Sequence, residues 1–304
     1  MQIPATFDQA RRLLAIRPVG ALPLQIRRLE LAVQGAAHTL DVVQPIVGDI
    51  CVGPYLDLPD ADVPVSAGML AQWGAGLPHA LDAAVTNSFG RPIAEAERVE
   101  SVHLYRDVRF AATALLRPEL VRGLPVDGDP VVLVPTVGNM IVGGSADAAG
   151  LTFMARIADR ILETDRHPVS IQPMVLHGFG WALFDWPDAT QPYAHTLRRR
   201  WDTLQYGAQR PPLQAHYERA GQPHRVAELA LAAKDGDTLT YTTLTEGAPT
   251  VLPPADVVVL IRSDGQATRL PMEQLIRTPG LLVPVPDSLP PLAFATRFPD
   301  ELTR

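Results

Sequence analysis

Paired apolar runs joined by short glycine-containing turns constrain the fold of this chain more than any other feature. Such pairs occupy residues 129–144, 169–187 and 224–247. Their turns fall at Gly138-Asn139, Gly178-Phe179-Gly180 and Asp235-Gly236. Two strand-like runs separated by a turn of this kind form an antiparallel β-hairpin. The sequence therefore predicts three hairpins and, with them, antiparallel sheets.

Helical patterns are interspersed among these hairpins. Pro78 stands where the first turn of a helix tolerates proline. The apolar face of this helix comprises Leu77, Ala80, Leu81, Ala84 and Val85. A second helix is expected over residues 147–163, with Ser145 as its cap, and a shorter one over residues 6–16. Residues 22–33 alternate apolar and polar side chains and predict a strand. The fold class expected is α+β with mainly antiparallel sheets, because hairpins rather than strand–helix–strand units dominate.

The C-terminal third contains a polar helix that the sequence predicts to end at Pro211-Pro212, followed by a short helical piece. The run "ADVVVLI" (residues 255–261) is continuously apolar and predicts a buried strand. A last short helix is expected near residues 272–277. Two organisations fit this pattern. Either lobes of residues 1–189 and 190–304 join at the polar helix, or the chain forms one compact domain.

Composition excludes several classes of protein. The 304 residues carry a net charge of −7, which argues against a nucleic-acid binder, because such proteins usually carry a basic surplus. Cys51 is the only cysteine, so there is no intrachain disulfide and no thiolate zinc cluster. The phosphate-binding loop, the dinucleotide fingerprint and the H-E-x-x-H motif are all absent. We therefore expect no cofactor, no metal site and no nucleic-acid partner. No apolar run has the length of a membrane span or signal peptide, which favours a cytoplasmic protein.

Two local patterns look like chemistry but have simpler interpretations. His79, Asp82 and Thr86 share a face of the helix that follows Pro78, and we expect this face to be solvent-exposed rather than catalytic. The consecutive basic residues Arg198, Arg199 and Arg200 suit an anion or an acidic partner surface, although such a run is more often a solvated surface.

Three segments together resemble the YtpQ-like family of bacterial proteins. They are "LDLPDADVPVSAGMLAQWGAGLPHALDAAVTN", "LQYGAQRPPLQAHYERAG" and "TLTYTTLTEGAPTVLPPADVVVLI". The resemblance extends over about residues 57–261. Leu244 departs from it, because a tryptophan is expected before the glutamate-glycine pair.

The resemblance implies an α+β fold but no catalytic residues, because the family is uncharacterised. It draws attention to five polar residues as binding candidates: Tyr206, Gln209, Arg210, Glu246 and Asp256. We expect Arg210 and Glu246 to pair between the polar helix and the end of the last hairpin. Trp73 is expected to fix its loop to the core.

Two functions remain open on this evidence. The first is a non-enzymatic binding or protein-interaction factor, with an adaptor, immunity-type or assembly role. It would bind a protein partner through a sheet edge or an acidic surface, and it is compatible with a homo-oligomer. The alternative is a hydrolase or transferase with a dispersed site. In that enzyme Glu246 or Asp256 would act as the acid or base and Arg210 would hold an anion.

Overall fold

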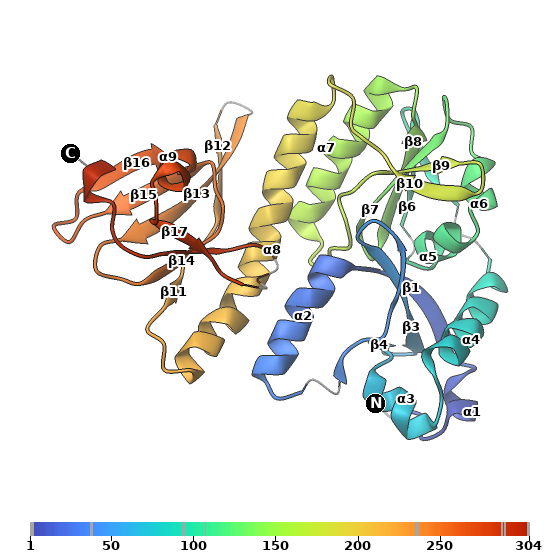
Figure 1. Ribbon diagram of the computed structural model, residues 1–304. Helices are drawn as coiled ribbons and strands as arrows, with labels where there is room; N and C mark the ends of the chain where they lie inside the picture. Colours follow the sequence, from blue (N-terminus) through green and yellow to red (C-terminus); the bar gives the residue numbers. More distant parts are fainter. Residues whose placement is uncertain are drawn as a thin grey trace. The chain divides into compact units, whose positions relative to one another are not determined.

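The computed structural model describes residues 3–36, 39–92, 95–106, 108–234, 237–286, 288 and 290–302. The chain forms two compact units (Figure 1). Unit 1 comprises Met1–Leu24 and Ala36–Leu197, and unit 2 comprises Gln25–Gly35 and Arg198–Arg304. The C-terminal part thus incorporates a segment from near the N-terminus, which the sequence patterns did not indicate.

Unit 1 contains two antiparallel sheets. The first has the order β1-β3-β2, with β4 also paired to β3, and the second has the order β10-β9-β7-β8-β6-β5. Their strands are β1 (Leu14–Gly20), β2 (Gln44–Val47), β3 (Ile50–Leu58), β4 (Ala61–Pro64), β5 (Glu97–Val99), β6 (Val102–Tyr105), β7 (Pro130–Thr136), β8 (Asn139–Gly144), β9 (Met174–His177) and β10 (Gly180–Leu183).

Helices of unit 1 pack against these sheets through small and apolar side chains. They are α1 (Phe7–Ala10), α3 (Ala67–Trp73), α4 (Leu77–Phe89), α5 (Val108–Leu116), α6 (Glu119–Arg122) and α7 (Ala148–Thr164). α4 contributes Ala80, Leu81 and Ala84 to one core cluster, together with β1 and β3. His79, Asp82 and Thr86 are exposed, which confirms the expected solvent face. Trp73 is buried and its indole N–H donates to the Pro4 carbonyl at 2.9 Å.

Unit 2 contains two four-stranded sheets, in the orders β12-β13-β15-β16 and β11-β14-β18-β17. Their strands are β11 (Arg225–Val226), β12 (Ala230–Lys234), β13 (Asp237–Thr245), β14 (Thr250–Leu252), β15 (Val257–Ile261), β16 (Ala267–Pro271), β17 (Leu282–Pro284) and β18 (Ala293–Ala295). Its short helices are α9 (Met272–Arg277) and the 3-10 helix η2 (Asp300–Leu302). Two long helices, α2 (Ala21–Val33) and α8 (Gln191–Arg219), have residues in both units.

The α+β class with mainly antiparallel sheets is confirmed. The three predicted hairpins are present as β7–β8, β9–β10 and β12–β13, although the turn at Asp235-Gly236 lies outside the described residues. β13 and β15 pair in parallel, which the hairpin pattern did not predict. The division of the chain at residue 190 stays a prediction.

The strand predicted over residues 22–33 is wrong, because this segment forms the helix α2. Its leucines, arginines, glutamine and glutamate are good helix formers, and Pro23 lies in the first turn, where proline is tolerated. Arg27 and Glu30 also form an ion pair three residues apart, at 2.6 Å. Alternation at one end of this segment concealed a helical pattern that extends over its whole length.

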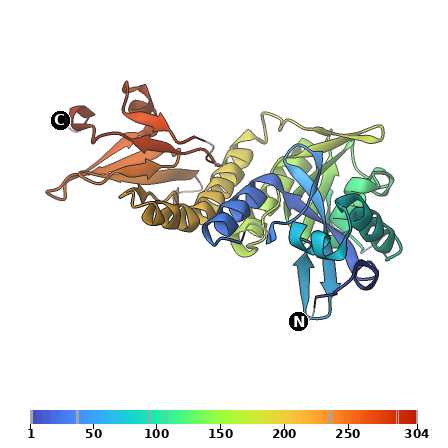
Figure 2. The same cartoon turned by 60° about the horizontal axis from the view of Figure 1, so that its bottom comes forward.

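The break predicted at Pro211-Pro212 is also wrong, since α8 continues through both prolines to Arg219 (Figures 1 and 2). Each proline removes one N–H that would bond to a carbonyl four residues earlier. Those carbonyls belong to Gly207 and Ala208, which are exposed. Water can therefore donate hydrogen bonds to these carbonyls. Gly207 has no side chain and Ala208 has only a methyl group, which leaves space for the proline rings.

Shorter elements required further corrections. The helix expected over residues 6–16 is limited to α1, and β1 begins at Leu14. Residues 96–106 contain the antiparallel pair β5–β6, with Glu100 at φ 55 in the turn. The N-cap of α7 is Asp147 and not Ser145, whose hydroxyl accepts instead from the Asp129 N–H at 2.8 Å.

Two expected absences concern the described part of the chain. No helix there is long and apolar enough to cross a membrane. Cys51 is buried and is the only cysteine of the sequence, so the chain has no intrachain disulfide.

Candidate functional site

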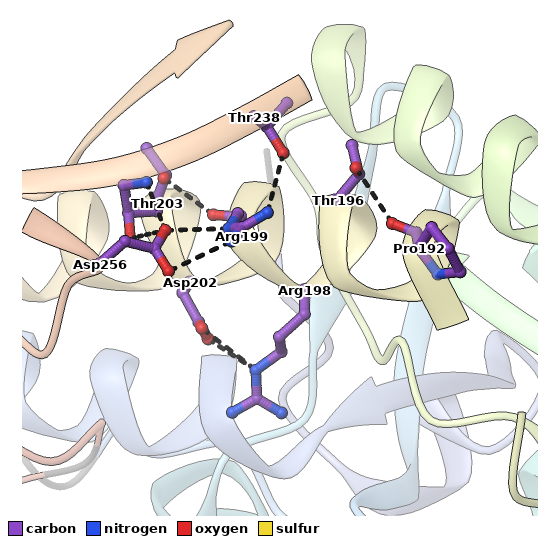
Figure 3. Close-up of polar contacts among 9 residues, drawn as sticks. Pro192, Thr196, Arg198, Arg199, Asp202, Thr203, Thr238 and Asp256 are labelled. Carbon is purple, nitrogen blue, oxygen red and sulfur yellow. Dashed lines mark hydrogen bonds and ion pairs between the residues drawn. The ribbon is translucent and has the colours of Figure 1, made fainter. Parts of the chain in front are cut away.

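Asp256 lies immediately before β15, and its carboxylate is held by hydrogen bonds from two elements of unit 2. The Arg199 guanidinium of α8 donates to both carboxylate oxygens, through Nε at 2.9 Å and Nη2 at 3.2 Å (Figure 3). Thr240 of β13 donates to the same carboxylate from its backbone N–H at 2.7 Å and from its hydroxyl at 2.9 Å. Arg199 also reaches Thr238. Asp256 therefore connects the helix with the sheet.

The electrostatics of Asp256 favour a structural role. Burial raises the pKa of its carboxyl, but the hydrogen bonds from Arg199 and Thr240 outweigh burial and hold the pKa below the ordinary value. A carboxylate that stays ionised and already accepts four hydrogen bonds is poorly suited to accept or donate a proton near neutral pH. The arrangement fits a bridge between two elements better than it fits catalysis.

The basic run on α8 is largely engaged in contacts of its own. Arg198 pairs with Asp202 one turn later, at 3.0 Å (Figure 3). Arg199 is bound to Asp256, and Arg200 has interaction partners as well. A guanidinium already bound to a carboxylate attracts an external anion less strongly. The anion or partner surface expected at these three residues stays a prediction.

Tyr206 and Gln209 are buried in unit 2 and bind backbone carbonyls. The Tyr206 hydroxyl donates to the Pro291 carbonyl at 2.7 Å, and the Gln209 amide donates to the Pro290 carbonyl at 3.1 Å. Burial raises the pKa of Tyr206, and the nearby Asp202 carboxylate adds to that effect. Both side chains therefore anchor the segment around residue 290 to α8.

Arg210 and Glu246 have different partners in the structure. Arg210 donates to the Glu228 carboxylate at 3.0 Å and to the Val226 carbonyl at 3.2 Å. Glu246 accepts from the Ser263 N–H at 2.7 Å, and this bond lowers the pKa of its carboxyl. No contact joins the two side chains within the described residues, so the pair expected from the sequence finds no support.

A pocket of about 420 Å³ brings two of the five candidates together. Its lining comprises Thr203, Tyr206, Gly207, Arg210, Pro211, Gln214, Glu228 and Leu229. Gln209, Glu246 and Asp256 are not part of that lining. The proposed acid–base and anion-binding groups therefore do not share this pocket, which contains Arg210 but neither candidate carboxylate.

The most distinctive surface of unit 2 is one face of the sheet β12-β13-β15-β16, here called the outer face. Strand register places one set of residues on it. This set is Ala230, Ala232, Asp237, Leu239, Tyr241, Thr243, Thr245, Val257, Val259, Ile261, Ala267, Arg269 and Pro271. All of them are exposed or half-buried.

The opposite face of the same sheet forms the core of unit 2. Leu244, Val258 and Leu260 are buried there with Met272 and Leu275 of α9. A sheet with only one buried face usually has polar side chains on the other. Here the centre of the outer face is apolar, and Leu239 and Tyr241 remain 41% and 37% exposed.

β15 shows how the sequence pointed to the outer face without identifying it. Its apolar run predicts a strand buried on both faces, but only Val258 and Leu260 are buried, whereas Val257, Val259 and Ile261 are half-buried. The expectation of a fully buried strand is thus wrong. The sequence signal for the outer face is a continuously apolar strand, β15, that lies next to hairpin strands in which apolar and polar residues alternate.

A second exposed apolar group lies at the turn between β9 and β10 of unit 1. Phe179 is 76% exposed there, and the Arg122 guanidinium lies over its ring at 3.9 Å. Leu183, at the end of β10, is 56% exposed as well, and the Arg122 cation partly covers the Phe179 ring. The outer face of unit 2 is broader and therefore a better candidate for binding.

Comparisons with family models, curated proteins and solved structures found no match to this chain. Within the described residues, no group of three or more histidine, cysteine, aspartate or glutamate side chains could hold a metal ion.

Proposed function

We propose that this protein is a protein-interaction factor that binds its partner through the outer face of the sheet β12-β13-β15-β16. The proposal rests on one observation: on one sheet face Leu239 and Tyr241 are exposed, and Val257, Val259 and Ile261 are only half-buried. Contiguous exposed apolar side chains rimmed by polar ones are typical of protein-binding surfaces. Covering them would remove apolar area from water, which is the main favourable contribution to association.

The contacts of the candidate polar residues support binding rather than catalysis. The carboxyl groups of Asp256 and Glu246 have lowered pKa values and already accept hydrogen bonds within the protein, and Arg210 is paired with Glu228. The hydrolase or transferase alternative needs such groups to converge on a substrate. The interaction role needs only the outer face.

This proposal includes the remaining expectations from the sequence. They are kinship with the YtpQ-like family, a bacterial and cytoplasmic protein, and an adaptor, immunity-type or assembly role with a protein partner.

A matched pair of substitutions tests the proposed function. Val259→Lys places a charge at the centre of the outer face, whereas Ile276→Lys places the same charge on α9 at another exposed apolar position, 64% exposed. Both variants should keep the wild-type circular dichroism spectrum. The amount of partner that co-purifies from the native host should fall at least tenfold with Val259→Lys and should stay at the wild-type level with Ile276→Lys.

Two results would refute the role. One is equal retention of the partner by Val259→Lys and the wild type. The other is the absence of any stoichiometric partner in repeated native purifications.

A further inference from the structure

The size of the outer face restricts what can cover it. Its four strands are about 4.8 Å apart and its central part is about five residues long, which gives roughly 17 by 19 Å. A stable interface between globular proteins buries about 800 Å² on each partner. A face of about 300 Å², even allowing for side-chain relief, is too small for a stable dimer of this chain and suits a single secondary-structure element.

A helix fits these dimensions better than a strand. An α-helix is about 10 Å across, and twelve residues extend for about 18 Å, close to the length of the face. A partner strand would instead add to an edge, at β12 or β16, by backbone hydrogen bonds. Edge addition leaves the Val257, Val259 and Ile261 side chains uncovered. An amphipathic helix covers them with its apolar stripe.

The charge distribution on the outer face adds a second requirement. Arg269 lies at the middle of the edge strand β16, directly opposite Val259 on the neighbouring strand β15, and it is exposed. Within the described residues it has no ion pair. Asp237 begins β13 at one end of the face, and Arg225 reaches Thr245 at the other end. A partner that covers Val259 therefore approaches the Arg269 guanidinium, and leaving that charge without a partner would weaken binding.

We propose that the outer face binds an amphipathic helix of about three turns from another protein, with an acidic side chain placed against Arg269. This inference rests on the proposed function and specifies the chemistry of the partner. The stripe of the helix has apolar residues at the i, i+3, i+4 and i+7 positions, and the acidic residue flanks that stripe.

Site-specific cross-linking in the native host tests this inference on the full chain. A photoreactive benzoylphenylalanine replaces Tyr241 on the outer face, and mass spectrometry identifies the residue to which it becomes attached. We expect a segment of another protein with the helical apolar spacing and a flanking aspartate or glutamate. Arg269→Glu should reduce the cross-link yield at least fivefold. Arg277→Glu, which changes an exposed arginine on α9, should leave the yield unchanged.

Three results would overturn the inference while leaving the proposed function intact. They are attachment to a segment with the two-residue alternation of a strand, attachment to a segment without an acidic residue beside the stripe, and equal yields for Arg269→Glu and wild type. Attachment to a second copy of this chain would overturn the inference in favour of self-association. Absence of any cross-link from position 241 would overturn both the inference and the proposed function.

As a direct check, the cross-linked segment is synthesised as a peptide and titrated into the protein labelled at its methyl groups. The methyl signals of Val257, Val259 and Ile261 should shift, because these side chains lie on the outer face. Those of Val258 and Leu260 report the opposite, buried face and should shift less. Exchanging the acidic residue of the peptide for lysine should weaken binding at least fivefold.

Discussion

Removing the Asp256 carboxylate should destabilise unit 2 by an amount that its contacts allow us to work out. In Asp256→Ala the buried Thr240 loses an acceptor for its N–H and its hydroxyl, which lie 2.7 and 2.9 Å from the carboxylate. Leaving a buried donor without a partner costs about 1–3 kcal/mol. The ion pair with Arg199 adds less than about 1 kcal/mol, because the two side chains are 32% and 39% exposed and solvent screens them. The expected loss is about 2–3 kcal/mol.

Asp256→Asn separates these two contributions. The amide oxygen at the Oδ2 position still accepts from Thr240. The charge is lost together with the Arg199 Nη2 hydrogen bond to Oδ1, and about 1 kcal/mol of stability with them. Glu273→Gln serves as the control, since its pair with Arg277 lies on the exposed surface of α9, and it should change stability by less than about 0.5 kcal/mol.

Hydrogen exchange of residues 237–245 in urea provides the assay, because it follows β13 separately from unit 1. A bridging role of the Asp256 carboxylate is refuted if the stability of Asp256→Ala lies within about 0.5 kcal/mol of the wild type, or if the Asn and Ala variants are equally destabilised.

The pH dependence of this difference has a defined sign. The pKa of Asp256 is lowered in the folded protein, so its contribution is complete above the unfolded-state pKa of about 3.9 and is lost as the pH falls through the folded value. The stability gap between wild type and Asp256→Ala should therefore stay constant from neutral pH to about pH 5 and narrow below about pH 4. A gap that stays unchanged down to pH 2.5 would contradict a charged bridge.

Three further substitutions test other parts of the structure. Asp147→Ala removes the side chain that accepts the Gly150 N–H at the start of α7 and should cost about 1 kcal/mol in urea denaturation, whereas Ser145→Ala should leave the helix cap intact. Gly144→Ala places a Cβ 2.1 Å from a backbone carbonyl oxygen, so the thermal midpoint of unit 1 should fall by several degrees, equivalent to about 1–3 kcal/mol. Tyr206→Phe removes the hydrogen bond to the Pro291 carbonyl and should cost about 1 kcal/mol by the same urea assay, without altering binding at the outer face.

Local patterns predicted the elements whose partners are close in sequence. The hairpin β7–β8 and the helices α4 and α7 follow from turn residues and from apolar spacing, which act within a few residues of each other. α2 was mistaken for a strand because its apolar residues satisfy both periodicities over a short window. The break predicted within α8 is wrong because the low helix propensity of proline does not indicate whether the carbonyls left without a donor reach water.

The candidate site depended on longer-range information. The sequence singled out Arg210, Glu246 and Asp256, but the partner of each was decided by which strands pair and where α8 lies within unit 2. Arg210 forms an ion pair with Glu228, and Asp256 accepts hydrogen bonds from Arg199 and Thr240. A salt bridge forms only where two side chains lie close together in space. Spacing along the chain predicts such contacts only within one or two helical turns.

The sequence by itself determined that this chain forms antiparallel hairpins and amphipathic helices, that it lacks a disulfide, and that β15 is an apolar strand. Periodicity and turn chemistry are local, and they are written directly in the order of residues. Only the tertiary structure decided that one face of β15 is buried against α9 while the other meets solvent. Burial depends on which other elements cover a strand, and those elements come from distant parts of the chain.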